Sequence, residues 1–196
     1  MHKKMKIRNA AKLTDSKWLN LFEIAYVDAA GRTRTWQTVS RAGKPKCITG
    51  KYDPPDAVVI VAFHTAAARL VVTREFRVPL ADFEYGFPAG LVDNGETIVQ
   101  AARRELMEET GLNLTRCIRI SPPLYSSAGI TDESVSMVYV ECDGTPSTEG
   151  NTGSELIEVQ LISPLQAAQL CSSAYLKFDV KAWLVINEFA EKGTLA

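Results

Sequence analysis

The chain has 196 residues, a length that favours one domain with an elaboration over two full domains. Hydrophobic residues make up 46%, charged residues 23%, and the net charge is −1, which excludes a wholly disordered chain and gives no sign of a basic nucleic-acid surface or an anionic-membrane anchor. The longest apolar run, residues 57–63, is far shorter than the roughly 20 residues that cross a bilayer. No apolar stretch follows the basic start, so we expect no signal peptide. The charge and the short apolar runs lead us to expect no membrane partner and no nucleic-acid partner.

The predicted elements begin with a β-hairpin. Residues 18–28 have strand propensity, residues 29–32 have turn composition, and Thr33–Ser40 forms the return strand. Residues 43–45 then mark a boundary. We therefore predict an N-terminal β segment over residues 1–45 and a main domain over residues 46–196.

In the main domain, hairpins connect most of the predicted strands. Ala57–His64 and Arg69–Arg77 form one hairpin, and later strands are predicted at residues 118–120, 135–141 and 156–162. Helical patterns cover Ile98–Thr110, residues 164–170 and residues 176–191. Helices interleaved with hairpins predict an α/β layer fold with a mixed sheet.

Cysteine and histidine usage narrows the chemistry. The chain has four cysteines without a CxxC pair, which favours reduced thiols in a cytoplasmic protein over a disulfide scaffold or a structural zinc site. Its two histidines are His2 and His64, so we do not expect a histidine-based triad or metal site. Hydrolytic chemistry would have to depend on carboxylates and hard cations.

The helix predicted over Ile98–Thr110 carries the most informative charges. Thr97 and Gln100 form a capping box at its start, and Gly111 supplies the left-handed residue that ends it. At about 100° per residue, Glu105 and Glu109 lie on the apolar arc of the helix, and Glu108 flanks them.

A solvated acidic face is the alternative interpretation of these three glutamates. Buried like charges one turn apart would be neutralised unless a cation holds them, and Mg²⁺ prefers such oxygen ligands beside substrate phosphates. The pattern therefore predicts a divalent metal site. The turn-rich loop at residues 88–96 leads into this helix, and its glycines let the backbone approach a ligand.

A family resemblance appears in this stretch. Gly90, Glu96 and the run of residues 104–112 match the fixed positions of the Nudix box, so the chain resembles hydrolases that cleave a nucleoside diphosphate linked to another moiety. The resemblance implies an α/β/α sandwich with a mixed sheet, preceded by a small N-terminal β domain. It also implies Mg²⁺, with Mn²⁺ as a substitute, held by the Ala89 carbonyl, Glu105 and Glu109. Arg104 would brace the glutamates.

Motifs along most of the chain resemble the ADP-sugar pyrophosphatase branch, in which two tryptophans from different subunits of a dimer sandwich adenine. Trp18 and Trp36 stand at the matching positions, although packing within a hairpin is their alternative role. The resemblance places Arg41 and Arg77 beside the diphosphate and terminal sugar, where either could otherwise be an ordinary surface charge. Further substrate-binding candidates are Gln37 and Leu91.

Two departures from the branch leave the preferred sugar open. Ala128-Gly129 stands where a proline followed by glycine is common, and Gly86 stands where a glutamate is usual, with Glu84 two residues earlier.

Glu155 lies outside the box, after a loop rich in Gly, Ser, Thr and Asn. A strand-edge charge is the alternative, but the segment resembles the loop that brings an extra glutamate over the metals. We predict Glu155 and Glu108 as catalytic candidates, together with Arg104.

The sequence thus predicts a cytoplasmic homodimer that hydrolyses ADP-ribose or a related ADP-sugar to AMP and a sugar phosphate. A UDP- or GDP-linked sugar is the alternative substrate, because stacking tolerates any base. A non-catalytic ADP-ribose sensor would be expected to lose a box glutamate, and this chain keeps them all.

Overall fold

The computed structural model describes residues 5–149 and 156–194, and its chain divides into two compact units. Unit 1 combines residues 1–56 with residues 123–135, and unit 2 combines residues 57–122 with residues 136–196. We refer to residues 123–135 as the return segment, because the chain comes back to unit 1 there.

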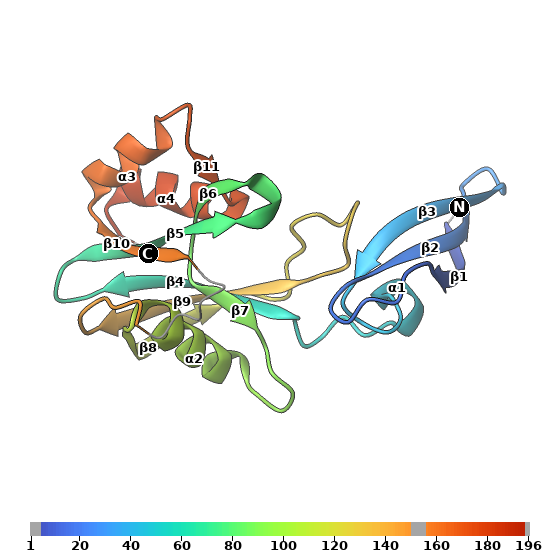
Figure 1. The fold of residues 1–196 in the computed structure, drawn as a ribbon, viewed down its shortest axis with the longest axis horizontal. Coiled ribbons are helices and arrows are strands. Elements are labelled where there is room, and N and C mark those ends of the chain that lie inside the picture. Colours follow the sequence, from blue (N-terminus) through green and yellow to red (C-terminus); the bar gives the residue numbers. More distant parts are fainter. Residues whose placement is uncertain (1–4, 150–155, 195–196) are drawn as a thin grey trace. The chain divides into compact units, whose positions relative to one another are not determined.

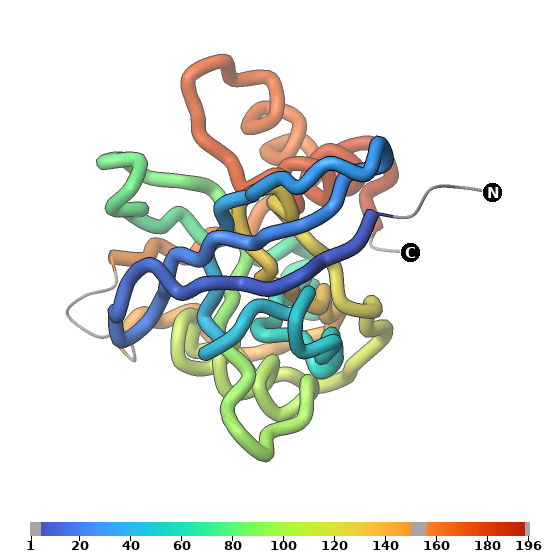
Figure 2. The backbone as a smooth tube through the Cα atoms, turned by 90° about the vertical axis from the view of Figure 1, so that its right-hand side faces the viewer, coloured from blue at the N-terminus to red at the C-terminus, as the bar shows by residue number. Residues whose placement is uncertain are grey.

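Unit 1 contains a three-stranded antiparallel sheet in the order β1-β2-β3 (Figures 1 and 2). Its strands are β1 (Lys6–Lys12), β2 (Asn20–Val27) and β3 (Thr33–Ser40), followed by the short helix α1 (Lys46–Thr49). The predicted hairpin is confirmed. Asp28 fixes its turn by accepting hydrogen bonds from Ala30 N and Arg32 N, both at 2.9 Å, and Gly31 has a φ of 82°.

Strand β1 has no counterpart in the sequence prediction. Its side chains are almost all exposed, so it lacks the alternation of apolar and polar residues that marks a half-buried strand. The strand forms because its backbone pairs with β2, with a register shift between Ile7 and Asn9. Pairing of this kind depends on the neighbouring strand and leaves little trace in local composition.

The return segment lies along the free edge of β3. Val39 pairs with Thr131 in a parallel bridge, and Val39 N donates to Ile130 O at 2.8 Å. Lys46 adds a polar connection, since its ammonium donates to Asp56 at 2.5 Å and to Ser134 Oγ at 2.7 Å. These contacts join the return segment to residues about 90 positions away in the chain.

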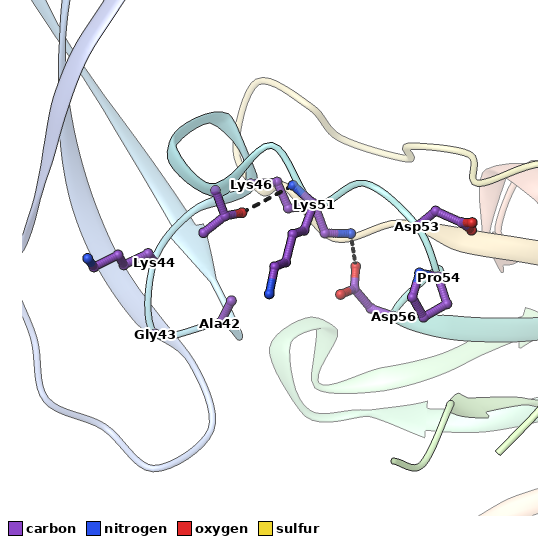
Figure 3. A pocket seen from close by; sticks show the side chains of 9 residues that line it. Ala42, Gly43, Lys44, Lys46, Lys51, Asp53, Pro54 and Asp56 are labelled. Atoms are coloured by element: carbon purple, nitrogen blue, oxygen red, sulfur yellow. Dashed lines mark hydrogen bonds and ion pairs between the residues drawn. The ribbon is translucent and has the colours of Figure 1, made fainter. Parts of the chain in front are cut away.

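A cavity of about 580 Å³ lies in unit 1 and is lined by side chains from residues 42–56 (Figure 3). Lys46 and Asp56 both line this cavity and form an ion pair, so the carboxylate of Asp56 neutralises the charge of the buried Lys46 ammonium. The lining includes none of the site residues predicted from the sequence.

Unit 2 is built on a mixed sheet, which has eight strands in the described part of the chain. Its main path runs β11-β6-β5-β4-β9-β8, while β10 pairs with β5 and β7 pairs with β4. β11 is parallel to β6, and the hairpin partners are antiparallel. The strands are β4 (Ala57–His64), β5 (Arg69–Arg77), β6 (Asp82–Gly86), β7 (Ala89–Leu91), β8 (Asn113–Ile120), β9 (Val135–Asp143), β10 (Ile157–Ile162) and β11 (Lys177–Phe178).

Helices cover both faces of this sheet. Helix α2 (Ile98–Thr110) lies on one face, and α3 (Pro164–Cys171) and α4 (Val180–Lys192) lie on the other (Figure 1). Val58, Ile60 and Ala62 of β4 belong to the core cluster under α2. On the opposite face, Phe63 packs edge-to-face with Phe189 of α4, at 6.3 Å between ring centroids. Because β4 is covered on both faces, its sequence is a continuous apolar run. The predicted α/β/α sandwich is confirmed.

The predicted last helix begins later than expected. Lys177 and Phe178 pair with β6 as β11, and the helix starts only at Val180. Asp179 caps it by accepting hydrogen bonds from Lys181 N and Ala182 N, at 2.9 and 3.1 Å. Among the described residues, the helices are too short or too polar to cross a membrane.

Candidate active site

Helix α2 begins and ends at the residues that its sequence predicts. The Thr97 hydroxyl accepts from Gln100 N at 3.3 Å, and the Gln100 side chain accepts from Thr97 N at 2.9 Å, which completes the capping box. At the other end, Gly111 has a φ of 69° and donates to Met107 O. These caps fix the register in which the helix presents its glutamates.

Arg104 is the centre of a carboxylate cluster on α2. Its guanidinium binds Glu96 through two nitrogens, at 2.9 and 3.1 Å. Nη1 also donates to Glu105 at 2.7 Å and to Glu108 at 3.2 Å, while Nη2 donates to the Leu91 carbonyl at 2.9 Å. One planar, always charged group thus orients three carboxylates and one carbonyl. The predicted bracing role of Arg104 agrees with this geometry.

The charges of the cluster do not balance. Glu96, Glu105 and Glu108 surround a single guanidinium. Burial raises the pKa of Glu105, whose side chain is only 12% exposed, and nearby Glu108 and Glu96 add to this effect while Arg104 opposes it. The hydrogen bond from Arg104 lowers the pKa of Glu96. The excess negative charge around a partly buried carboxylate favours an additional cation.

Strand β7 brings the main chain of residues 89–90 against these glutamates. Ala89 N donates to the Glu109 carboxylate at 3.2 Å. A Cβ atom on Gly90 would lie 1.9 Å from Glu105 Oε1, so a side chain there would occupy the space of the carboxylate. The structure therefore brings together Ala89, Glu105 and Glu109, the three metal ligands predicted from the sequence, and glycine is the residue that permits it.

The donor set suits a hard divalent cation. Carboxylate oxygens lie beside the main chain of β7, and Gly90 leaves the space in which they gather. Within residues 5–149 and 156–194, no three His, Cys, Asp or Glu side chains converge to form a complete metal site. A site with fewer than three such side chains is usual for Mg²⁺, because this ion typically binds one or two carboxylates and takes its other ligands from water and substrate phosphates.

The two predicted adenine-stacking tryptophans are exposed residues of unit 1. Trp36 on β3 is 52% exposed, and Trp18, just before β2, is 66% exposed. The indole N–H of Trp36 donates to Gly129 O at 3.1 Å, whereas the Lys17 ammonium lies 4.3 Å from the ring of Trp18. Such exposure does not suit packing inside a hairpin, the alternative considered for both residues.

Gln37 and Arg41 belong to the same part of unit 1. Gln37 follows Trp36 on a regular strand, so the two side chains point to opposite faces of the sheet. The structure thus does not bring Gln37 beside the Trp36 ring. Arg41 donates from Nε to Glu133 of the return segment at 2.5 Å. That contact orients the guanidinium and leaves its two terminal nitrogens without a partner in the described residues.

Arg77 and Leu91 are the substrate-binding candidates in unit 2. Arg77 lies between Glu75, at 2.7 Å, and Glu84, at 3.3 Å, which face each other across β5 and β6. Leu91 has an exposed side chain and a carbonyl bound to Arg104. Glu155 lies outside the described residues. Gly129 and Glu133, the partners of Trp36 and Arg41, could not be predicted, because no local pattern signals contacts 92 or 93 residues apart.

The fold and the carboxylate-bearing helix define the class of protein. The family model described as the NUDIX domain matches residues 53–184, so the chain belongs to the NUDIX family, as the box predicted. The ADP-ribose pyrophosphatase of Saccharomyces cerevisiae is 32% identical over 137 residues, covering 69% of this chain and 58% of the relative. The ADP-sugar pyrophosphatase of Mus musculus is 31% identical over 137 residues, covering 67% and 59%.

The chain thus spans just under three fifths of the length of these two relatives. A crystal structure of an ADP compounds hydrolase aligns with 97% of this chain and 96% of its own, with a TM-score of 0.68 and 19% identity. At that identity the likeness concerns the fold, which it supports along nearly the whole chain.

Proposed function

We propose that this NUDIX protein hydrolyses the diphosphate of ADP-ribose or a related ADP-sugar to AMP and a sugar phosphate. The observation that carries the proposal is the carboxylate cluster, in which Glu105 packs on Gly90 and Glu109 binds Ala89. A relative named ADP-ribose pyrophosphatase and another named ADP-sugar pyrophosphatase support the substrate class. The exposed tryptophans of unit 1 support a base-binding surface.

Glu105, Glu109 and the Ala89 carbonyl would hold the divalent cation, which we propose to be Mg²⁺, with Mn²⁺ as a substitute. When bound, the cation supplies positive charge to the diphosphate and makes the attacking water more acidic. Arg104 holds the glutamate side chains in place, as its contacts with Glu105 and Glu108 indicate. A carboxylate fixed in advance needs no rearrangement when charge develops at phosphorus.

The chemical step consumes one water molecule. Its oxygen forms a bond to one phosphorus, the bond to the bridging oxygen breaks, and the bridging oxygen remains on the other phosphate. We propose that Glu155, or a box glutamate such as Glu108, takes the proton from the water. Arg41 and Arg77 would bind the diphosphate and terminal sugar, and Leu91 would contact the substrate. Trp18 and Trp36 would stack on adenine, with Gln37 as a further binding candidate.

A substrate panel tests this function. The purified chain would receive Mg²⁺ and ADP-ribose, an ADP-hexose, a UDP-hexose or a GDP-hexose, and chromatography would identify the phosphate products. We expect AMP and a sugar phosphate from the ADP-linked compounds, with Glu105→Gln as the inactive control. Faster cleavage of the UDP- or GDP-linked sugar would favour the alternative substrate, and cleavage of none would contradict the proposal.

We also propose a cytoplasmic homodimer. Exposed apolar side chains of unit 1 support self-association: Met5, Ile7, Leu13 and Leu19. The four cysteines are free thiols, as is usual in a reducing compartment. Sedimentation equilibrium would give the mass of the assembly, and a monomer at micromolar concentration would contradict the dimer.

A further inference from the structure

Trp36 combines two properties that are unusual in one residue. Its indole N–H is bound to Gly129 O at 3.1 Å, yet the residue is 52% exposed. In the described residues, no aromatic ring or cation lies over its ring. An indole that serves only packing would bury its face, whereas this one is fixed at its edge.

The acceptor of this bond is itself held in place. Gly129 is followed by Ile130, whose carbonyl accepts from Val39 N at 2.8 Å and from the hydroxyl of the buried Thr38 at 3.0 Å. Two residues further along, Asp132 accepts from Ser40 Oγ at 3.1 Å and from Lys46 N at 2.7 Å. The position of the Gly129 carbonyl is therefore determined by a docked segment rather than by a free loop.

The contacts follow the pleat of β3. Trp36, Thr38 and Ser40 lie on one face of the strand, and each side chain bonds to the return segment. Trp36 is the exposed member of this row, while Thr38 and Ser40 are buried. The row thus anchors the return segment at its buried end and orients a tryptophan at its exposed end.

Trp18 provides a contrast within the same unit. Its indole N–H has no hydrogen bond among the described residues, and its ring is approached by the Lys17 ammonium. Both tryptophans are exposed, so exposure alone does not explain why only Trp36 is bonded at its edge.

We propose that the return segment is a positioning element for the nucleotide base. Its Gly129 carbonyl fixes the plane of the Trp36 indole. Thr38 holds that carbonyl in place by donating a hydrogen bond to the adjacent carbonyl, that of Ile130. The indole is then ordered before a ligand arrives, so less side-chain entropy is lost on binding. This inference rests on the proposed function, in which Trp36 stacks on adenine.

The decisive variant removes only the N–H group. Site-specific replacement of Trp36 by its benzothienyl analogue exchanges the indole N–H for sulfur at nearly the same ring size. Affinity for AMP would be measured by calorimetry in EDTA, where no hydrolysis step is involved. We expect a loss of about 3- to 10-fold, because the freed indole must then be ordered when AMP binds. The same analogue at Trp183 of α4, which is 39% exposed and assigned to no substrate contact, is the matched control and should change affinity by less than about 2-fold.

A second variant acts on the segment without touching the ring. Thr38→Val keeps the size of the side chain and removes the bond to Ile130 O, so we expect AMP affinity to fall about 2- to 5-fold. Thr35→Val on the same strand is the control, because the exposed Thr35 side chain has no bond among the described residues. Affinity for ribose 5-phosphate, which lacks the base, should stay unchanged in both variants, and a general folding defect would lower it.

The outcomes separate this inference from the proposed function. If Trp36→Ala leaves AMP affinity unchanged, base stacking by Trp36 is wrong and the positioning role falls with it. If Trp36→Ala weakens AMP binding while the benzothienyl analogue binds like the native protein, stacking stands and the positioning role is overturned. Loss of AMP affinity in both the analogue and Thr38→Val, with ribose 5-phosphate affinity retained, supports the proposal.

Discussion

The carboxylate cluster of unit 2 and the aromatic surface of unit 1, which consists of the exposed Trp18 and Trp36, differ in how far apart in the sequence their contacting residues lie. In the cluster, Arg104 binds groups that are 1 to 13 positions away, and Ala89 binds Glu109 over 20 positions. In unit 1, Trp36 and Arg41 bind partners 93 and 92 positions away. A cluster organised by one helix and the loop before it is encoded in one short motif, whereas the aromatic surface depends on how the chain returns.

The two regions also differ in charge. The cluster gathers three glutamates around one arginine, and burial raises the pKa of the partly buried Glu105. The candidate residues of unit 1 are exposed, and Arg41 has a single carboxylate partner in the part of the chain that the structure describes. This difference predicts that changes in the cluster act mainly on turnover, while changes in unit 1 act mainly on substrate affinity.

We expect the largest loss from Glu155→Gln. If Glu155 takes the proton from the attacking water, turnover should fall by about 100- to 10,000-fold, the range of general-base contributions. Affinities for substrate and Mg²⁺ should change much less, because Ala89, Glu105 and Glu109 remain. Steady-state kinetics over a Mg²⁺ titration measures both quantities.

The same titration separates two roles for Glu155. If it is chiefly a metal ligand, Glu155→Gln should raise the Mg²⁺ concentration needed for half-maximal rate, and excess metal should restore much of the activity. Of these two roles, we expect proton transfer. Native turnover at ordinary Mg²⁺ would reject both roles.

Glu109→Gln should lower turnover by at least about 100-fold, because the amide keeps the shape but loses the charge that would hold the cation. Weaker Mn²⁺ binding, followed by electron paramagnetic resonance, is an independent measurement that does not require turnover. Near-native turnover at saturating Mg²⁺ would show that Glu109 is not part of the metal site.

Gly90→Ala tests whether the backbone of β7 shapes the cluster. The new Cβ would overlap the Glu105 carboxylate, which must then move away from Arg104. Because a misplacement of about 1 Å can cost about 100-fold in rate, we expect a loss of that order. The carboxylate ends a flexible side chain, so the fold should be retained, as circular dichroism would show.

Gly43→Ala is the matched control, because nothing lies within 4 Å of its new Cβ and its backbone is not in the left-handed region. An active Gly90→Ala enzyme would mean that the cluster tolerates displacement of Glu105.

Local signals account for what the sequence predicted well. Thr97, Gln100 and Gly111 delimit α2 correctly, and the box glutamates gather where the helical periodicity places them. The buried face of α2 and the apolar run of β4 likewise follow from their patterns. The catalytic and metal-binding roles of the box glutamates stay predictions.

The elements that the sequence did not predict form through distant partners. β6 and β11 are short strands defined by pairing, and β11 occupies the first residues of a pattern that otherwise indicates a helix. β7 has only three residues and exists because it pairs with β4. The return segment is the clearest case, since its contacts with β3 depend on folding of the chain between them.

The smallest effects come from the two arginines, which compare the regions directly. Their side chains are equally exposed, 43% for Arg41 and 44% for Arg77, so burial does not distinguish them. Among residues 5–149 and 156–194, Arg41 has one carboxylate partner, Glu133, whereas Arg77 lies between Glu75 and Glu84. Two carboxylates leave less positive potential for a diphosphate than one does.

We therefore expect Arg41→Ala to weaken ADP-ribose binding in EDTA by about 10-fold and Arg77→Ala by about 3-fold, since hydrogen bonds to charged groups are the stronger kind and the extra carboxylate competes for Arg77. Arg34→Ala is the control, because Arg34 is an exposed arginine paired with Asp28 and assigned to no substrate contact. The difference should shrink as salt concentration rises, because exposed charges are screened. An equal or larger loss for Arg77→Ala would mean that substrate displaces its carboxylate partners, and the charge argument that separates the two regions would then be wrong.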